Sequence, residues 1–220
     1  MAAKRVVLTG YEPWSHASEN PTLALLDKAR ERNFADIELI TLRVPVESEG
    51  IAPLVDEALE THKPDIWISL GLFPGSPVVA VERTAANVMD FPVPDNVEVQ
   101  PVDEPVYANG PFAYRSTLPI KAMVAAMNER GVPAKVSNTA STYLCNQIMY
   151  TALHLVQEKG METRAGFIHV PCSPGYVAQA GYPEHEWPSM SLDLMDEAVD
   201  AAITTAARQD SDIAAPPKGY

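Results

Sequence analysis

The cysteine at position 145 has the side chain best suited to nucleophilic chemistry. It follows a run of small polar residues, Ser137–Thr142, and it precedes a helical pattern. We predict a helix over Thr142–Lys159, capped by Ser141 or Thr142, which places Cys145 in the first turn. The helix dipole favours a thiolate there, and free N–H groups of the same turn could bind an oxyanion. The alternative is an inert cysteine that packs the helix.

Two further side chains could complete a catalytic set with this thiol, His169 and Glu82. His169 interrupts the apolar run Ala165–Val170, where an imidazole needs a hydrogen-bond partner. It could be the general base beside a thiolate, or a structural histidine. Glu82 lies in another apolar stretch, where it could orient His169 as the acid of a triad does, or form an ion pair with Arg83. The residues alone leave these alternatives open.

The remaining histidines and the second cysteine stand in less suggestive places. We expect surface or packing roles for His16, His62, His154 and His185, and a packing role for Cys172. Two cysteines are too few for a secreted disulfide scaffold, so both thiols are expected to be free in a reducing compartment, with a single disulfide bridge as the alternative.

The elements that must position these side chains alternate along the chain. We predict strands at Arg5–Thr9, Ile37–Val44, Asp65–Leu70 (closed by Gly71), Ala134–Ser137 and Ala165–Val170. We predict helices at Pro21–Glu31 (capped by Asn20), Ser48–His62, Lys121–Arg130, Thr142–Lys159 and Leu192–Arg208. The segment Val78–Tyr107 lacks helical periodicity and is interpreted as a β excursion followed by an irregular loop. Alternating strands and helices predict an α/β fold with a parallel sheet covered by helices on both faces.

In such a sheet, ligands gather beyond the carboxyl ends of the strands. The segments to inspect are therefore Gly10–Trp14, Gly71–Ser76, Asn138–Cys145 and His169–Ser173. The sequence contains neither a repeat nor a linker, which favours one domain over residues 1–208. The polar, Pro-rich residues 209–220 are expected to form a flexible tail.

The acidic charge of the chain excludes several classes of partner. The formal net charge is −13, from 16 basic and 29 acidic residues. Such a surface repels phosphate backbones and anionic lipid heads, so we expect neither nucleic-acid nor membrane binding. The N-terminus has no signal-peptide pattern, and no segment approaches the roughly 20 apolar residues of a membrane span. The sequence therefore predicts a cytoplasmic protein.

Several short motifs span nearly the whole chain in a recurring order. They are Leu8–Trp14 with Asn20-Pro21, Glu82-Arg83 with Asn87, Pro94–Asn96, Gly110-Pro111 with Ala113-Tyr114 and Ser116–Pro119, Val136–Ala140 with Cys145-Asn146 and Met149-Tyr150, Gly166–Pro171, and Ser191–Asp193. Together they resemble the pyroglutamyl peptidase I family, also called pyrrolidone-carboxylate peptidases.

The resemblance implies a function and a site. The nucleophile of the family falls on Cys145, its histidine on His169 and its acid on Glu82. A single-domain three-layer α/β/α sandwich of the phosphorylase/hydrolase type is implied, with a mostly parallel central sheet. So is a cysteine peptidase that removes N-terminal pyroglutamate through a thioester. The substrate would be a peptide or a small acyl-amide. Neither cofactor nor metal is implied, and homotetramers or dimers are usual.

The departures from the family surround the expected acyl pocket. Tyr11 and Trp14 stand where the family has phenylalanines, and we expect them to bind substrate together with Asn20 and Leu72. Leu72 replaces a glutamine, Pro92 replaces an arginine, and the loop Ser15–Ala17 lacks paired glycines. The alternatives are therefore a related cysteine amidase with another small N-acyl specificity, or a non-catalytic binding protein on the same scaffold. A nucleoside phosphorylase is disfavoured, because no glycine-rich phosphate cradle accompanies a basic residue.

Overall fold

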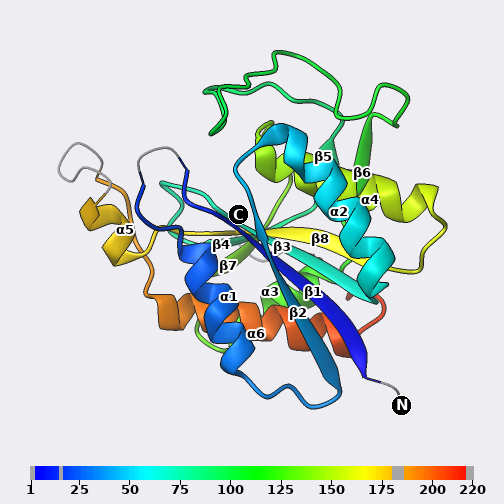
Figure 1. The fold of residues 1–220 in the computed structure, drawn as a ribbon. Helices are drawn as coiled ribbons and strands as arrows, with labels where there is room; N and C mark the ends of the chain where they lie inside the picture. Colours follow the sequence, from blue (N-terminus) through cyan, green and yellow to red (C-terminus); the bar gives the residue numbers. More distant parts are fainter. Residues whose placement is uncertain (1–2, 15–16, 180–185, 217–220) are drawn as a thin grey trace.

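A six-stranded sheet forms the centre of the molecule (Figure 1). The structure is a computed structural model that describes residues 3–14, 17–179 and 186–216. The strands are β1 (Lys4–Tyr11), β2 (Ile37–Val44), β3 (Ile66–Leu72), β4 (Val79–Glu82), β7 (Ala134–Ser137) and β8 (Arg164–Val170). Their order is β2-β1-β3-β8-β4-β7, with β4 antiparallel to β8 and the other pairs parallel. The prediction of a mostly parallel sheet is confirmed, and the reversal at β4 was not predicted.

Helices cover both faces of the sheet, as Figure 1 shows. The helices are α1 (Pro21–Glu31), α2 (Ser48–His62), α3 (Ile120–Glu129), α4 (Leu144–Glu158), the short α5 (Pro174–Gln179) and α6 (Leu192–Arg208). One apolar cluster joins the sheet to α1, α3 and α6, and another joins it to α2 and α4. The three-layer α/β/α sandwich is therefore confirmed. The predicted bounds of α1, α2 and α6 agree with the structure, whereas α5 was not predicted.

Side-chain alternation along the strands divides the sheet residues between these two clusters. Ile168 and Val170 of β8 belong to the cluster with α1, α3 and α6, whereas Phe167 belongs to the cluster with α4. His169 is two residues beyond Phe167, so it faces α4 as well. The same alternation directs Tyr11 of β1 and Glu82 of β4 to the α4 side. Three strands, β1, β4 and β8, can therefore present side chains to the start of one helix.

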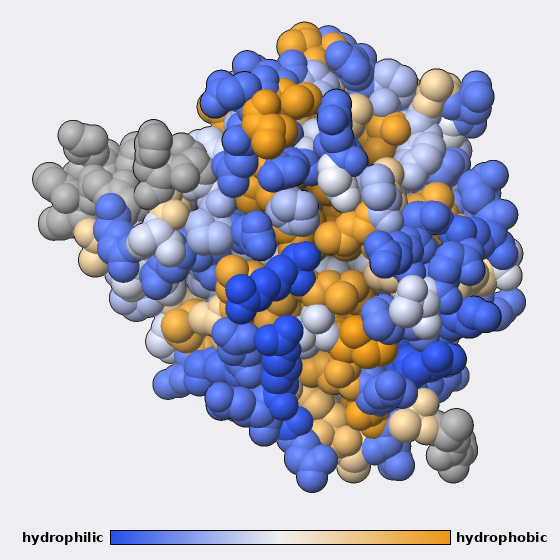
Figure 2. All heavy atoms as spheres, viewed as in Figure 1, coloured by the Kyte–Doolittle hydropathy of each residue, from blue (hydrophilic) through white to orange (hydrophobic). Residues whose placement is uncertain are grey.

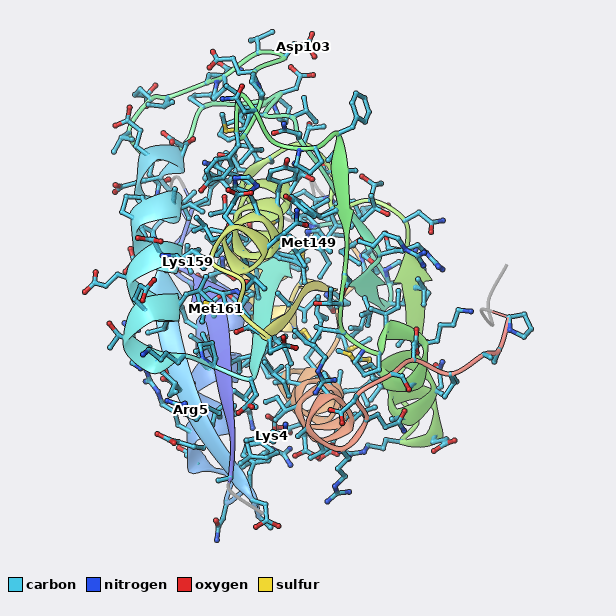
Figure 3. The ribbon with its side chains drawn as sticks, turned by 90° about the vertical axis from the view of Figure 1, so that its right-hand side faces the viewer. Lys4, Arg5, Asp103, Met149, Lys159 and Met161 are labelled. Atoms are coloured by element: carbon cyan, nitrogen blue, oxygen red, sulfur yellow. The ribbon has the colours of Figure 1, made fainter. Side chains whose placement is uncertain are left out.

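Strand β3 runs further than predicted. Gly71 does not end the strand, because it pairs in register with His169, and Leu72 pairs with Val170. The expected β excursion is confirmed by β4 and by β5 (Thr84–Ala86), which pairs with the unpredicted β6 (Ala113–Arg115) in a two-stranded antiparallel sheet. The irregular loop between β5 and β6 extends beyond α4, with Asp103 at its far end (Figure 3).

The outer surface mixes hydrophilic residues with an apolar strip over the edge strand β2 (Figure 2). Most side chains of β2 are half-buried, and its two exposed residues are the charged Glu38 and Arg43. Charged residues on an edge strand discourage pairing with another chain. Within the described residues, no helix combines the length and apolarity needed to cross a membrane.

Part of the segment beyond α6 contacts the start of α3. The carboxylate of Asp212 accepts hydrogen bonds from the backbone N–H groups of Lys121 and Ala122, both at 3.0 Å. Because Pro119 gives α3 no side-chain cap, Asp212 satisfies N–H groups that would otherwise lack partners. Residues 217–220 of the expected tail lie outside the described residues.

Candidate active site

A buried hydrogen bond joins His169 and Glu82. The Nδ1 atom of His169 lies 2.8 Å from Oε1 of Glu82, and the two residues are only 4% and 2% exposed. The antiparallel register explains the contact, since Ala80 pairs with His169 and Glu82 lies two residues further along the same face of β4. With Nδ1 held by the carboxylate, the Nε2 atom is left for a second partner.

Arg83, the other candidate partner of Glu82, points elsewhere. Its Nε atom donates to Oδ1 of Asn138 at 2.9 Å. Of the two pairings that the sequence allowed for Glu82, the structure therefore contains the one with His169. The second carboxylate oxygen of Glu82, Oε2, is buried without a hydrogen-bond partner among the described residues.

Cys145 is the second residue of α4. The predicted cap at Ser141 or Thr142 is wrong, because the N-cap is Tyr143, which makes no side-chain capping bond. The hydroxyl of Thr142 instead donates to the Asp90 carbonyl at 2.7 Å, and Ser141 has a left-handed φ of 67°. Without a capping side chain, the first N–H groups of α4 remain available to a ligand beside the thiol.

Gly71 makes room for the side chain of Cys145. A Cβ atom on Gly71 would lie 2.8 Å from Sγ of Cys145 and 2.5 Å from Cζ of Phe167. Both distances are shorter than real contacts of a Cβ atom, so no larger residue fits without movement. Because Gly71 is the register partner of His169 in β3, Cys145 lies over the strand that neighbours the histidine.

The protonation state of His169 is set by its surroundings. Burial is the largest effect on His169, and it favours the neutral imidazole. Electrostatic attraction to Cys145, a hydrogen bond with its side chain, and the Glu82 carboxylate outweigh burial and raise the pKa of His169 to about 9. The imidazolium form of His169, held by the Glu82 carboxylate beside Cys145, is therefore favoured near neutral pH.

A pocket of about 370 Å³ opens beside Cys145 and His169. Its other lining residues are Tyr11, Trp14, Asn20, Val46, Leu72, Phe73, Pro74, Pro92, Val93, Ala140, Ser141, Tyr143, Leu144 and Tyr176. In the part of the chain that the structure describes, no Lys, Arg, Asp or Glu lines it. The pocket therefore suits a compact, uncharged group.

The four residues predicted to bind substrate all line this pocket, in different ways. Tyr11 is buried, and its hydroxyl donates to the Leu144 carbonyl at 2.7 Å, next to Cys145 in the chain. Burial and the nearby charge of Cys145 raise the pKa of Tyr11. Trp14 is 39% exposed and offers an open aromatic face. Leu72 adds an aliphatic wall at the end of β3.

Asn20 has its polar groups engaged within the protein. Its Oδ1 atom accepts from the Thr22 backbone N–H at 3.1 Å, as the N-cap of α1, and its Nδ2 atom donates to the Glu12 carbonyl at 3.2 Å. Both bonds hold the chain between β1 and α1, where Trp14 lies. Asn20 thus supports the pocket by fixing this connection.

Sequence reasoning missed Phe73 and Tyr143 as site residues. Phe73 is 49% exposed, and its ring centroid lies 5.2 Å from that of His169. Tyr143 lines the pocket and donates its hydroxyl to the Pro94 carbonyl at 3.1 Å, and burial raises its pKa to about 12. The available signal was position: Phe73 directly follows β3, and Tyr143 lies two residues before Cys145.

The motif Pro94–Asn96 has a supporting role. Asp95 is 3% exposed, and its Oδ2 atom accepts from the Ser48 N–H at 2.7 Å, where α2 has no other side-chain cap. Its Oδ1 atom accepts from the Val97 and Val99 N–H groups, both at 3.0 Å. These bonds fix the loop that carries Pro92 and Val93 to the pocket.

Other candidate residues lie away from this chemistry. His154 Nδ1 is 3.0 Å from the Tyr114 hydroxyl, and Cys172 is fully buried, which raises the pKa of its thiol. Both findings fit packing roles. His16, His185 and Ser15 lie outside the described residues. Across the described ranges, no group of three or more His, Cys, Asp or Glu residues could hold a metal ion.

A family model and individual relatives agree on the proteins that this chain is similar to. The model of a family described as pyroglutamyl peptidase matches residues 4–209. The pyrrolidone-carboxylate peptidase of Thermococcus onnurineus is 41% identical over 204 residues, which cover 93% of this chain and 99% of that protein. The corresponding protein of Vibrio vulnificus is 35% identical over 209 residues, covering 95% of each chain.

Solved structures agree with these relatives. Pyrrolidone carboxyl peptidase from Thermococcus litoralis superposes with a TM-score of 0.90 at 34% identity, covering 97% of this chain and 99% of that chain. Pyroglutamyl peptidase I from Bacillus amyloliquefaciens gives a TM-score of 0.91 at 33% identity, covering 97% and 100%.

Proposed function

The chain belongs to the pyroglutamyl peptidase family, and from that premise we propose that it removes N-terminal pyroglutamate from peptides by cysteine catalysis. Cys145 is the nucleophile, His169 the general acid and base, and Glu82 the group that orients the imidazole. The observation that carries the proposal is the convergence of these side chains from α4, β8 and β4 beside one uncharged pocket.

The first step is formation of an acyl-enzyme. The Cys145 thiolate attacks the carbonyl carbon that joins pyroglutamate to the next residue. The carbonyl oxygen becomes an oxyanion, and N–H groups in the first turn of α4, which no side chain caps, could bind it. Collapse of this intermediate forms a thioester on Sγ and breaks the carbon–nitrogen bond.

The proton movements run through His169. Its imidazolium gives the Nε2 proton to the leaving amine, and the shortened peptide departs. The neutral imidazole then takes a proton from a water molecule as that water attacks the thioester, which releases free pyroglutamate and restores the thiolate–imidazolium pair. The Glu82 carboxylate keeps Nδ1 protonated throughout, so Nε2 always faces the reaction.

The pocket supports recognition of a small neutral ring. A lactam carries no charge, and among the described residues no Lys, Arg, Asp or Glu lines the pocket beside Cys145 and His169. The open face of Trp14 and the walls at Tyr11 and Leu72 suit a flat ring. A peptide whose first residue has a free, charged amine would bind poorly here, because the amine would lose its hydration and find no acidic partner.

A second candidate is a cysteine amidase with a different small acyl group. Leu72 and Pro92 favour it, because both line the pocket at positions where the sequence departs from the family. The catalytic steps would be the same, and only the acyl group would differ.

One assay tests both candidates. We expect the protein to release the arylamine from pyroglutamyl-arylamide and to leave prolyl-, alanyl- and acetyl-arylamides uncut. Cys145→Ala should lose at least about a thousandfold in kcat/KM. Cys172→Ala, at the other cysteine, is the matched control and should keep its activity. Well-folded protein that cuts another acyl-arylamide faster would favour the second candidate, and failure to cut any of them would contradict both.

Assembly and location extend the proposal. We propose that the protein acts as a homodimer or homotetramer in the cytoplasm, where a reducing medium keeps the Cys145 thiol free. The exposed Val97 and Val102, which are 48% and 66% accessible, are apolar side chains that a second subunit would cover. Sedimentation equilibrium would contradict this if it gave only the monomer mass.

A further inference from the structure

Phe73 occupies a defined place at the rim of the pocket. It directly follows β3, and its backbone N–H donates to the Val170 carbonyl at 3.0 Å, which fixes it beside the end of β8. Its ring lies 5.2 Å from the imidazole of His169, tilted by 44°. Half of the residue is nevertheless exposed, at 49%. An aromatic side chain is thus held next to the catalytic histidine with an uncovered face.

The chemistry of the leaving group determines which part of the substrate lies beside the Phe73 ring. His169 can protonate the leaving amine only if that nitrogen lies within hydrogen-bond reach of Nε2. The residue that follows pyroglutamate is bonded to the same nitrogen, so it must lie beside the imidazole. Other sides of the histidine are occupied, by Glu82 at Nδ1 and by the Phe167 ring at a centroid distance of 4.8 Å. Phe73 is the exposed apolar neighbour that remains.

We propose that Phe73 is a specificity-determining residue that binds the side chain of the residue following pyroglutamate. The inference rests on the proposed function and deepens it by naming a substrate class: peptides with an aromatic or large aliphatic second residue. No Lys, Arg, Asp or Glu joins Phe73 in lining the pocket, within the described residues, so a charged second residue finds no partner there. The net charge of −13 further disfavours acidic peptides.

The expected preference for a large apolar second residue is moderate, because Phe73 contacts only one side of that residue. A second residue that stacks on Phe73 buries part of its own surface and part of the exposed ring, while its other side stays in water. Partial burial of one large side chain corresponds to a gain of about tenfold in kcat/KM over alanine at the same position. Burial of this kind also covers the catalytic pair from solvent while the amine departs.

The test compares four peptides on several forms of the full protein. The substrates are pyroglutamyl-X-amides in which X is Phe, Leu, Ala or Asp, and the readout is the ratio of kcat/KM for X = Phe to that for X = Ala. The ratio cancels any change in His169 that affects both substrates equally. Phe73→Ala should lower the ratio from about ten to between one and two. Phe73→Leu should keep an intermediate ratio.

Phe112→Ala is the matched control. Phe112 is 93% exposed and does not line the pocket, so its loss should leave the ratio unchanged. Inhibition by 2-pyrrolidone, a lactam ring without a following residue, should also be the same in the unmodified protein and in Phe73→Ala.

Each outcome bears on the inference. An unchanged Phe/Ala ratio in Phe73→Ala would overturn it while leaving the proposed function intact. A loss of 2-pyrrolidone binding in that variant would also overturn it, because Phe73 would then contact the acyl ring. If the unmodified protein cut none of the four peptides or pyroglutamyl-arylamide, the proposed function would fail and this inference with it.

Discussion

The buried Glu82–His169 pair and the pocket wall are built in opposite ways. Glu82 and His169 lie within central strands and are 2% and 4% exposed. The wall residues Trp14 and Phe73 lie just beyond strand ends and are 39% and 49% exposed. The pair is fixed by sheet register, whereas the wall depends on loops that follow the strands.

This difference separates chemistry from selectivity. A side chain inside a sheet has its position set by hydrogen bonds on both sides and by packing above and below, so any replacement disturbs the reacting geometry. A half-exposed side chain contributes mainly contact area, and its replacement changes which substrate binds well. The distinction would be wrong if substitutions in the buried pair and in the pocket wall had similar effects.

The largest expected effect is that of Glu82→Gln. The amide keeps the size of the carboxylate but cannot stabilise the imidazolium, and it can present its NH₂ group to Nδ1 and favour the wrong tautomer. We expect kcat/KM to fall by about a thousandfold with unchanged circular dichroism. Glu38→Gln is the matched control, since Glu38 is an exposed strand glutamate in β2. A loss of less than about tenfold would show that the carboxylate is not needed.

The next effect is that of Gly71→Ala, which tests the packing around Cys145. The added methyl group would lie 2.8 Å from Sγ of Cys145, so the thiol or β3 must move. We expect kcat to fall by about a hundredfold and the free energy of unfolding to fall by about 1–3 kcal/mol. Gly50→Ala, in α2, is the control, because its nearest neighbour would be a Pro45 side-chain atom at 3.3 Å. Activity equal to that of this control would contradict the tight fit.

A pH profile tests the protonation state of His169. The pKa of His169 is raised to about 9 from an ordinary value of 6.5, so its imidazolium is present at neutral pH and is lost as the pH rises through about 9. We expect kcat/KM to fall about tenfold per pH unit above that point. Glu82 is one cause of the raised pKa, so Glu82→Gln should move the fall to lower pH. A profile that stays flat to pH about 10 would contradict the imidazolium.

The same shift has a consequence for stability. Since the pKa of His169 is higher in the folded protein than its ordinary 6.5, protonation of His169 favours folding. This contribution is complete below pH about 6.5, and it is lost as the pH rises toward 9. Urea unfolding across this range should therefore show a smaller pH dependence in His169→Gln than in the unmodified protein.

Local signals predicted much of the fold. The bounds of α1 follow from Asn20 as N-cap and Pro21 in the first turn, and those of α6 from an apolar period that begins after Ser191. Such features act over a few residues, so a single sequence contains them. The placement of β4 between β8 and β7 does not follow from chain order, because a strand that reverses direction can pair with any exposed edge.

For the candidate site as well, local signals were predictable from the sequence and strand pairing was not. Cys145 and His169 stand out as reactive residues next to helix and strand boundaries. The partner of Glu82 depends on the antiparallel register between β4 and β8, which no local signal fixes. Strand β7 runs opposite to β8, so the rule for parallel strand ends does not explain the segment that follows it. The expected segment Asn138–Cys145 nevertheless reaches the pocket, which Ala140, Tyr143 and Cys145 line. Phe73 was missed because exposure depends on tertiary packing.

The smallest expected effect is that of Trp14→Leu, and it decides whether the comparison holds. Trp14 is 39% exposed, so leucine removes an aromatic face without opening the buried pair. We expect KM for pyroglutamyl-arylamide to rise by about five- to tenfold while kcat changes by less than about twofold. Trp14→Phe keeps an aromatic face and should recover most of the KM. If Trp14→Leu instead lowered kcat as far as Glu82→Gln does, the wall would take part in the reacting geometry. The division between a rigid centre and a selective rim would then be wrong.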